Sequence, residues 1–210
     1  MTKIDFKKLH KDWYMPSKKA VSVVDIPAMN FLMIDGKGSP DENPSFKKAI
    51  EALFAVSFGL KFMFKKQPAP EGFFEYVVPP LEGLWWMPDN NPDFWVERKD
   101  QWLWTLMVMQ PDFFTGEMVA EMIGKVKAKK GLDVLDKMRF EPFHEGKSVQ
   151  ILHVGPYSEE GPNIQKMHDF VEEKGWALTG KHHEIYLGDP RRAAPEKLRT
   201  ILRHPIKESV

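Results

Sequence analysis

The sequence predicts an α+β fold in which a strand–strand–helix–strand–strand module occurs twice, giving about eight antiparallel strands, two long helices and a connector helix. Two observations predict it. The same order of extended and helical runs recurs in both halves of the 210-residue chain. Matching landmarks also keep a nearly fixed offset, since Gly36 and Gly155 lie 119 residues apart and Phe46 and Ile164 lie 118 apart. A repeat this long is a duplicated module rather than a solenoid.

The first module spans about residues 20–111. β-branched and aromatic residues dominate its extended runs, and glycine or proline follows most of them, which favours strands. A helix begins after Asn43, a preferred N-cap residue, with Pro44 at its first position. The four predicted strands are Val21–Val24, Asn30–Ile34, Phe73–Val78 and Trp102–Met109.

The second module spans about residues 138–206 and follows a connector helix over about 115–130. Glu145-Gly146 is interpreted as a short hairpin connection. A helix begins near Pro162 and ends at Gly175, a favourable C-terminal residue. Pro205 is expected to close the last strand. The four predicted strands are Arg139–His144, Ser148–Val154, His182–Leu187 and Leu198–Leu202. We expect residues 1–210 to form one domain.

Two such modules side by side create a seam, and concave seams between packed units often bind small ligands. Side chains alternate along a strand, so Glu184 and Tyr186 share one face of the sheet, and Ile185 and Leu187 share the other. If Ile185 and Leu187 pack under the second helix, Glu184 and Tyr186 point toward the seam.

Composition excludes several classes of function. Lys plus Arg and Asp plus Glu are both 30, whereas a dedicated nucleic-acid binder usually has a basic excess. The absence of cysteine excludes disulfides, thiolate metal sites and cysteine nucleophiles. The N-terminus lacks the apolar run of a signal peptide, and no stretch approaches the roughly 18 apolar residues of a membrane span. We therefore expect a cytoplasmic protein without nucleic-acid or membrane partners.

Tryptophan is concentrated in one part of the chain. Five of the seven tryptophans fall within twenty residues: Trp85, Trp86, Trp95, Trp102 and Trp104. Tryptophan rings attract flat or cationic partners, so this crowding favours a small-molecule pocket. Two alternatives stay open, namely a Trp-rich core with an exposed loop, or a protein-interaction anchor at residues 84–104.

Glu184 is the candidate for chemistry, because glutamate is depleted in the middle of strands. In an aromatic site it would hold a cationic ligand or act as a general acid or base. The alternative is an edge-strand glutamate paired with Arg191, Arg192 or a lysine. The adjacent His182 and His183 face opposite ways and cannot share an ion. His182 and Glu184 could share one, but no third ligand stands at a suitable spacing, so no metal is predicted. No cofactor is predicted either.

Several runs resemble the GyrI-like small-molecule-binding superfamily, in particular its stand-alone branch that includes cyclopropanoid hydrolases. The similarity covers about residues 21–206. The runs that carry it are Pro80–Trp86, Arg139-Phe140-Glu141, Val149–Tyr157 and His183–Arg192 with its continuation to Leu198. Members of this superfamily are built as a duplicated module, in agreement with the repeat.

The resemblance implies a function. Relatives include effector-binding domains of multidrug-responsive regulators and hydrolases that open the cyclopropane ring of DNA-alkylating natural products. By resemblance, Glu184 is the acid, base or water-orienting residue of a detoxifying protein. The alternative is a non-catalytic drug-binding or effector-sensing module that acts with a separate transcription regulator, and a second copy of the chain, as a homodimer, is a further candidate partner. The expected ligand-lining residues are Trp85, Trp86, Trp104, Phe140, Tyr157 and Tyr186.

Overall fold

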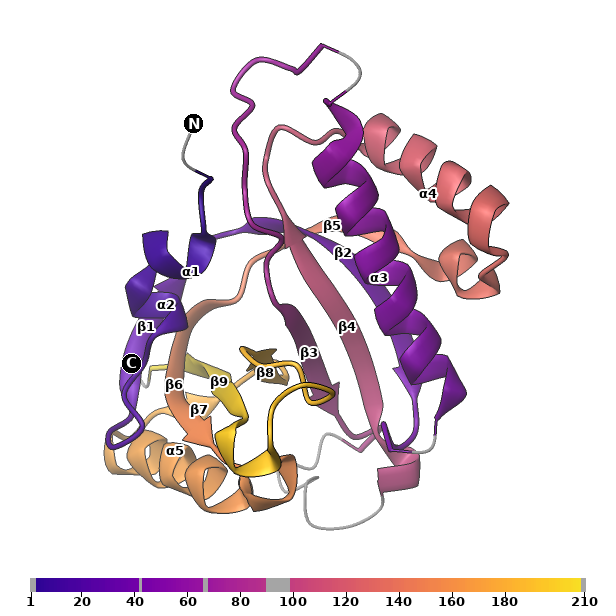
Figure 1. The fold of residues 1–210 in the computed structure, drawn as a ribbon. Helices are drawn as coiled ribbons and strands as arrows, with labels where there is room; N and C mark the ends of the chain where they lie inside the picture. The colour runs from indigo at the N-terminus through magenta and orange to yellow at the C-terminus, as the bar shows by residue number, and fades with distance from the viewer. Residues whose placement is uncertain (1–2, 42, 66–67, 90–98, 209–210) are drawn as a thin grey trace.

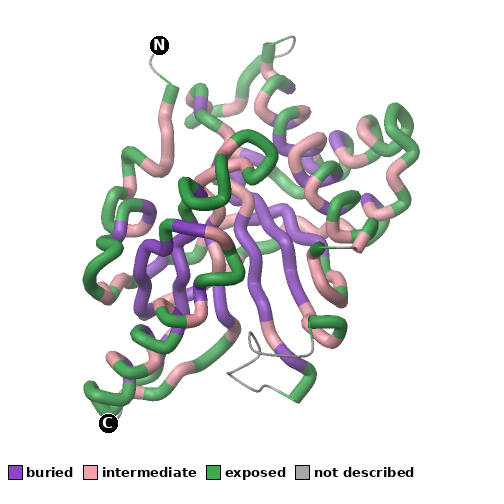
Figure 2. The backbone as a smooth tube through the Cα atoms, turned by 60° about the horizontal axis from the view of Figure 1, so that its bottom comes forward, coloured by how far each residue is buried: buried purple, intermediate pink, exposed green. Residues whose placement is uncertain are grey.

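The computed structural model describes residues 3–41, 43–65, 68–89 and 99–208. Within these ranges, the strands form the buried centre of the molecule, and exposed residues gather on the helices and connections (Figures 1 and 2). The α-helices are α1 Phe6–Leu9, α2 Lys11–Tyr14, α3 Pro44–Met63, α4 Gly116–Lys130 and α5 Gly161–Glu173. The strands are β1 Ser22–Ile26, β2 Met29–Lys37, β3 Leu81–Trp86, β4 Leu103–Gln110, β5 Arg139–Phe143, β6 Gly146–Val154, β7 Ala177–Leu178, β8 His182–Tyr186 and β9 Arg199–Lys207.

The strand pairing confirms the duplicated fold. The sheet has the order β1-β6-β9-β8-β3-β4-β2-β5, and the short β7 pairs with β9. In the first copy, β2, α3, β3 and β4 follow one another along the chain and pair as β2-β4-β3. In the second copy, β6, α5, β8 and β9 pair in the same way as β6-β9-β8. The two copies meet where β3 and β8 pair antiparallel.

Both long helices lie on the same face of the sheet, here called the helix-covered face (Figure 1). α3 buries its apolar side on strands of the first copy, with Leu53 and Val56 in one cluster with Trp104. α5 packs Ile164 and other side chains against Leu202 of the second copy. The side chains of Trp85, Glu184 and Leu202 share this face, because opposed residues of paired strands point the same way.

The local signals for the helices are confirmed. Asn43 caps α3, since its side-chain oxygen accepts a hydrogen bond of 2.9 Å from the Ser45 amide. The predicted connector helix is α4, which Thr115 caps and which packs on α3. None of the helices in the described ranges is both long and apolar enough to cross a membrane.

The predicted strand at Phe73–Val78 is wrong. The third strand is β3, which begins after the two prolines that were expected to close it. Phe73 and Phe74 instead pack their rings on Phe113, at centroid distances of 5.2 Å each. Tyr76 makes only an isolated bridge to Ile4. Ring packing, rather than strand pairing, explains the apolar character of this segment.

The hairpin interpretation of Glu145-Gly146 is also wrong, because β5 and β6 do not pair with each other. β5 pairs with β2, and β6 pairs with β1 and β9. The chain bends here because Glu145 turns inward to ion partners described below, and Gly146 adopts a φ of 69° that favours glycine. Pro205 does not end the last strand either: β9 continues to Lys207, and the Pro205 carbonyl accepts a 2.9 Å hydrogen bond from the Thr179 amide.

The N-terminal helices α1 and α2 cover part of the other side of the sheet, here called the opposite face. Ile185 packs there against Tyr14 and Leu152, so the condition that it lies under the second helix is not met. Tyr14 on α2 covers it instead. Glu184 therefore points toward the side that carries α3 and α5.

A buried ion network lies on the opposite face. His183 Nδ1 lies 2.9 Å from Glu145 Oε1, and His183 Nε2 lies 3.0 Å from Glu82 Oε2. Arg203 donates to the second Glu145 oxygen at 3.0 Å. Although burial opposes both charges, Glu145 raises the pKa of His183 to about 9, and His183 and Arg203 lower the pKa of Glu145 to about 2. These pairs satisfy charges that would otherwise be costly to bury.

Candidate functional site

Glu184 lies on a central strand, and its side chain is 14% exposed. It faces Gly83 on β3 and Leu202 on β9. A side chain at position 83 would crowd the site, because a Cβ there would lie 2.9 Å from Trp85 Nε1 and 3.1 Å from the Tyr186 hydroxyl. Glycine at this position thus leaves room for aromatic side chains beside the carboxylate.

Trp85, and not Trp86, shares the face of Glu184. The indole Nε1 of Trp85 donates a 3.0 Å hydrogen bond to the Tyr186 hydroxyl, which fixes both rings next to Glu184. Trp86 points to the opposite face, where Lys181 Nζ lies 3.3 Å from its ring centroid. The sequence left the orientation of the two tryptophans open, and strand alternation then places one on each side.

Tyr157 brings a third ring to the site from a short turn before α5. Its ring meets Tyr186 edge-on at 5.8 Å, and it is 39% exposed. His153 holds the turn: its Nε2 lies 3.1 Å from the Pro156 carbonyl, and its Nδ1 lies 3.0 Å from the Asn163 amide nitrogen. If Asn163 donates to Nδ1, the other nitrogen carries the proton and donates to the carbonyl.

Glu160 is a functional candidate that the sequence reasoning missed. It is 5% exposed, and its Oε1 atom has no hydrogen-bond partner among the described residues. Burial, and next the negative charge of Glu184, raise its pKa well above the usual range, which favours its protonated form. The sequence offered one signal for Glu160. It stands at the N-cap of α5, where Ser, Thr, Asp or Asn is preferred, so a glutamate there is unusual.

The two tyrosines also keep their protons. Burial, then Glu160 and Glu184, raise the pKa of Tyr157 to about 12. Burial, then Glu184 and Glu160, raise the pKa of Tyr186 as well. The arrangement therefore combines a protonated carboxyl and two phenol donors around Glu184. Such a group can hold a flat ligand and exchange protons with it.

Besides Trp86, two more of the predicted ligand-lining residues lie away from Glu184. Trp104 is 1% exposed and fills the core: its ring occupies the space where Gly36 lacks a side chain, with a would-be Cβ 2.1 Å away, and its Nε1 donates to the Gly38 carbonyl. Phe140 lies on β5, and three strands separate β5 from β8 in the sheet. Its ring packs against the core cluster that contains Trp104. Trp95 lies outside the described residues.

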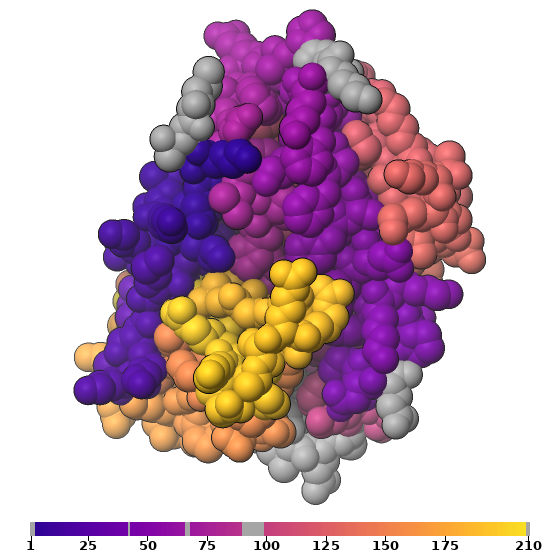
Figure 3. Space-filling view, in the orientation of Figure 1, coloured from indigo at the N-terminus to yellow at the C-terminus, as the bar shows by residue number. Residues whose placement is uncertain are grey.

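The alternative pairing of Glu184 with the nearby arginines is not found. Arg191 and Arg192 instead contact Asp189, at 2.9 and 3.8 Å. Asp189 belongs to residues 187–198, the connection between β8 and β9, which stands in front of the sheet beside α3 (Figure 3). His182 Nε2 lies 3.5 Å from Glu184 Oε1. Across the described ranges, no three His, Asp or Glu side chains are grouped to hold a metal ion.

Comparison with known proteins agrees with this architecture. The model of the GyrI-like small molecule binding domain matches residues 19–207. The chain belongs to this family. Among curated proteins, none matches the chain.

Solved structures similar to this GyrI-like protein include two from Listeria innocua. A hydrolase is 41% identical with a TM-score of 0.85, and an uncharacterized conserved protein is 42% identical with a TM-score of 0.88. Each comparison covers 98% of this chain and 100% of the other. The C-terminal domain of EcmrR shares the fold at 13% identity and a TM-score of 0.53, over 90% of this chain and 98% of that domain.

Proposed function

We propose that this GyrI-like protein acts in the cytoplasm, where it binds flat hydrophobic or cationic aromatic molecules beside Glu184 and hydrolyses strained cyclopropane electrophiles among them, which detoxifies them. The observation that carries the proposal is the buried carboxyl of Glu160, whose pKa is raised by burial and by the negative charge of Glu184. Residues 1–210 act as one domain in this proposal. The similarity to a Listeria innocua hydrolase supports it.

Recognition follows from the rings and the charge. Tyr157 and Tyr186 offer aromatic faces and edges on which a flat ligand stacks, and the buried Trp85 holds Tyr186 in place through its indole hydrogen bond. Within the described residues, no Lys or Arg lies within 4.0 Å of the Glu184 or Glu160 carboxyl groups. A cationic aromatic ligand would therefore give the Glu184 carboxylate a positive partner that no Lys or Arg of the described residues supplies. The exposed edge of Tyr157 is the side from which such a ligand enters.

The two carboxyl groups divide the chemistry of ring opening. Glu184 orients a water molecule and takes its proton as the water oxygen bonds to the cyclopropane methylene carbon. The carbon–carbon bond of the strained ring breaks, and its electron pair moves through the conjugated system to a carbonyl oxygen. Glu160 donates its proton to that oxygen. One water is added in total, and proton transfer from Glu184 back to Glu160 through solvent restores the site.

Turnover of a cyclopropane-bearing alkylator by purified variants tests this proposal. Glu184→Gln and Glu160→Gln should each lower kcat/KM by about 10²–10⁴-fold, the usual contribution of a general acid or base. Glu159→Gln is the matched control, because Glu159 is the exposed neighbour of Glu160 and should leave the rate unchanged. Equal rates for wild type and Glu184→Gln would remove the catalytic claim.

Binding is measured separately by tryptophan fluorescence. A lipophilic aromatic cation should quench Trp85 stoichiometrically, and Glu184→Gln should weaken this binding. Quenching without product for any cyclopropane substrate would leave the non-catalytic alternative, a drug-binding or effector-sensing module that acts with a separate regulator. No quenching by either neutral or cationic aromatics at micromolar concentration would contradict both functions.

A further inference from the structure

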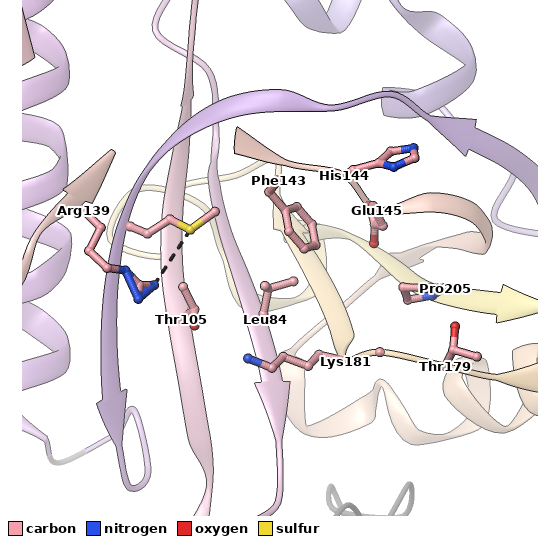
Figure 4. Close-up of a pocket in the computed structure, with 11 residues that line it drawn as sticks. Leu84, Thr105, Arg139, Phe143, His144, Glu145, Thr179, Lys181 and Pro205 are labelled. Atoms are coloured by element: carbon pink, nitrogen blue, oxygen red, sulfur yellow. Dashed lines mark hydrogen bonds between the residues drawn. The ribbon is translucent and has the colours of Figure 1, made fainter. Parts of the chain in front are cut away.

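A cavity of about 380 Å³ lies on the opposite face of the sheet, away from Glu184. Its floor is formed by Met33 and Leu84, and Leu84 points away from the face that carries Glu184 because strand neighbours alternate. Its two rims are the bend between β5 and β6, with Phe143, and the connection between β7 and β8, with Lys181 (Figure 4). The volume lies within the roughly 300–1,000 Å³ that is usual for small-molecule sites.

The middle of this cavity is apolar. Met33 and Leu84 belong to one buried cluster on this face, and Phe143 packs against the same cluster. Figure 4 shows Phe143 and Leu84 in the centre, between Arg139 on one side and Pro205 on the other. The apolar body of a ligand would remove these side chains from water and gain the corresponding free energy.

Most charges that border the cavity already have partners. Arg139 donates to both oxygens of Asp35, at 2.9 and 3.1 Å. Glu145 is held by His183 and Arg203. These groups therefore have little charge left for a ligand. Arg139 lies at the end of the cavity toward which the Lys181 side chain extends (Figure 4).

Lys181 differs from these charged groups in its partner. No carboxylate of the described ranges lies within 4.0 Å of its ammonium, which sits on the ring of Trp86 at 3.3 Å instead. Burial lowers the pKa of Lys181; the nearby Asp35 carboxylate opposes this effect, and Arg139 adds to it. An anion placed beside Lys181 would offset the cost of burying this charge.

We propose that this cavity binds a small amphipathic carboxylate, whose anionic group pairs with Lys181 and whose apolar body lies against Leu84 and Phe143. The two faces of the sheet then have opposite preferences. The face with Glu184 and Glu160 favours neutral or cationic aromatic molecules, and the opposite face favours organic anions. The second site uses none of the groups assigned to hydrolysis, so a result that refutes one proposal leaves the other unaffected.

Calorimetry with 1-naphthylacetate and its uncharged amide tests the proposal, because the two probes differ only in the charged group. The carboxylate should bind at least about tenfold more tightly than the amide. Lys181→Gln should weaken carboxylate binding about tenfold and leave the amide unchanged, whereas Lys181→Arg should retain the preference. Lys197→Gln, at an exposed lysine away from the cavity, is the control and should change neither affinity.

The location is tested by methyl NMR. Carboxylate binding should shift the methyl signals of Met33 and Leu84, and Glu184→Gln should leave the affinity unchanged. Equal affinities for the carboxylate and the amide would overturn the proposal. So would shifts confined to Ile151 and Leu202 on the helix-covered face, or no binding at millimolar concentration.

Discussion

The buried ion pair of His183 and Glu145 should make the stability of the protein fall as the solution becomes alkaline. His183 has a pKa of about 9 in the folded protein, against 6.5 for an ordinary histidine. The folded state therefore binds a proton more tightly than the unfolded state. The stabilisation is fully present below pH 6.5 and is lost as the pH rises through about 9.

The size of the loss follows from the two pKa values. At about 1.4 kcal/mol for each pKa unit, the change from 6.5 to about 9 corresponds to about 3 kcal/mol. The lowered pKa of Glu145 reports the same attraction from the other partner, so the two effects are not added. His204 acts in the opposite direction: burial, then His182 and His168, lower its pKa to about 3, so the stability that it contributes is present above pH 6.5 and is lost as the pH falls from 6.5 toward 3.

Urea denaturation at a series of pH values from about 6 to about 9.5 measures this loss, and NMR titration of the His183 ring measures its pKa directly. We expect the free energy of unfolding to fall by about 3 kcal/mol over this range, because His183 gives up its proton. Glu160 also favours the folded state at low pH, so the denaturation is repeated in Glu160→Gln to remove its contribution. A His183 ring that titrates near 6.5, or a flat stability profile in Glu160→Gln, would refute the assignment.

The remaining predictions concern two glycines and one carboxyl group. Gly36→Ala should destabilise the protein by about 1–3 kcal/mol in urea denaturation, because the new Cβ would meet the buried ring of Trp104 at 2.1 Å. Gly124→Ala, in open space on the exposed side of α4, should instead stabilise by about 0.5–1 kcal/mol; equal effects at both positions would contradict this reasoning. Glu160→Gln should gain stability relative to wild type as the pH rises above 4.5, because the folded wild type resists the ionisation that the unfolded chain undergoes. A stability difference that is independent of pH would argue against a protonated Glu160.

The sequence predicted the helices better than the strands, because helix signals are local. Asn43 and the spacing of apolar residues define α3 within a few positions, whatever surrounds it. Phe73–Val78 has the composition of a strand, but its rings pack with Phe113, which is distant in the sequence. No local pattern distinguishes these two outcomes. The duplication itself was visible because it depends on the order of elements rather than on their bounds.

The candidate site was predicted in part. The sequence placed Glu184 and Tyr186 on the same face, because residues two positions apart on one strand point the same way. The orientation of Trp85 and Trp86 depended on the register of β3, and a shift of one residue exchanges their faces. Glu160 owes its raised pKa to burial and to Glu184, which lies 24 positions further along the chain. Such an environment exists only after folding and leaves little trace in composition.

The pairing of β1 with β6 and of β2 with β5 means that each half of the chain completes the other's sheet. The first strand of each copy, β2 or β6, pairs with one strand from the other half of the chain. A backbone cut after α4, near Gly131, would therefore give two fragments that each expose unpaired strand edges. We expect such fragments to aggregate when expressed alone and to recover a folded complex when they are produced together.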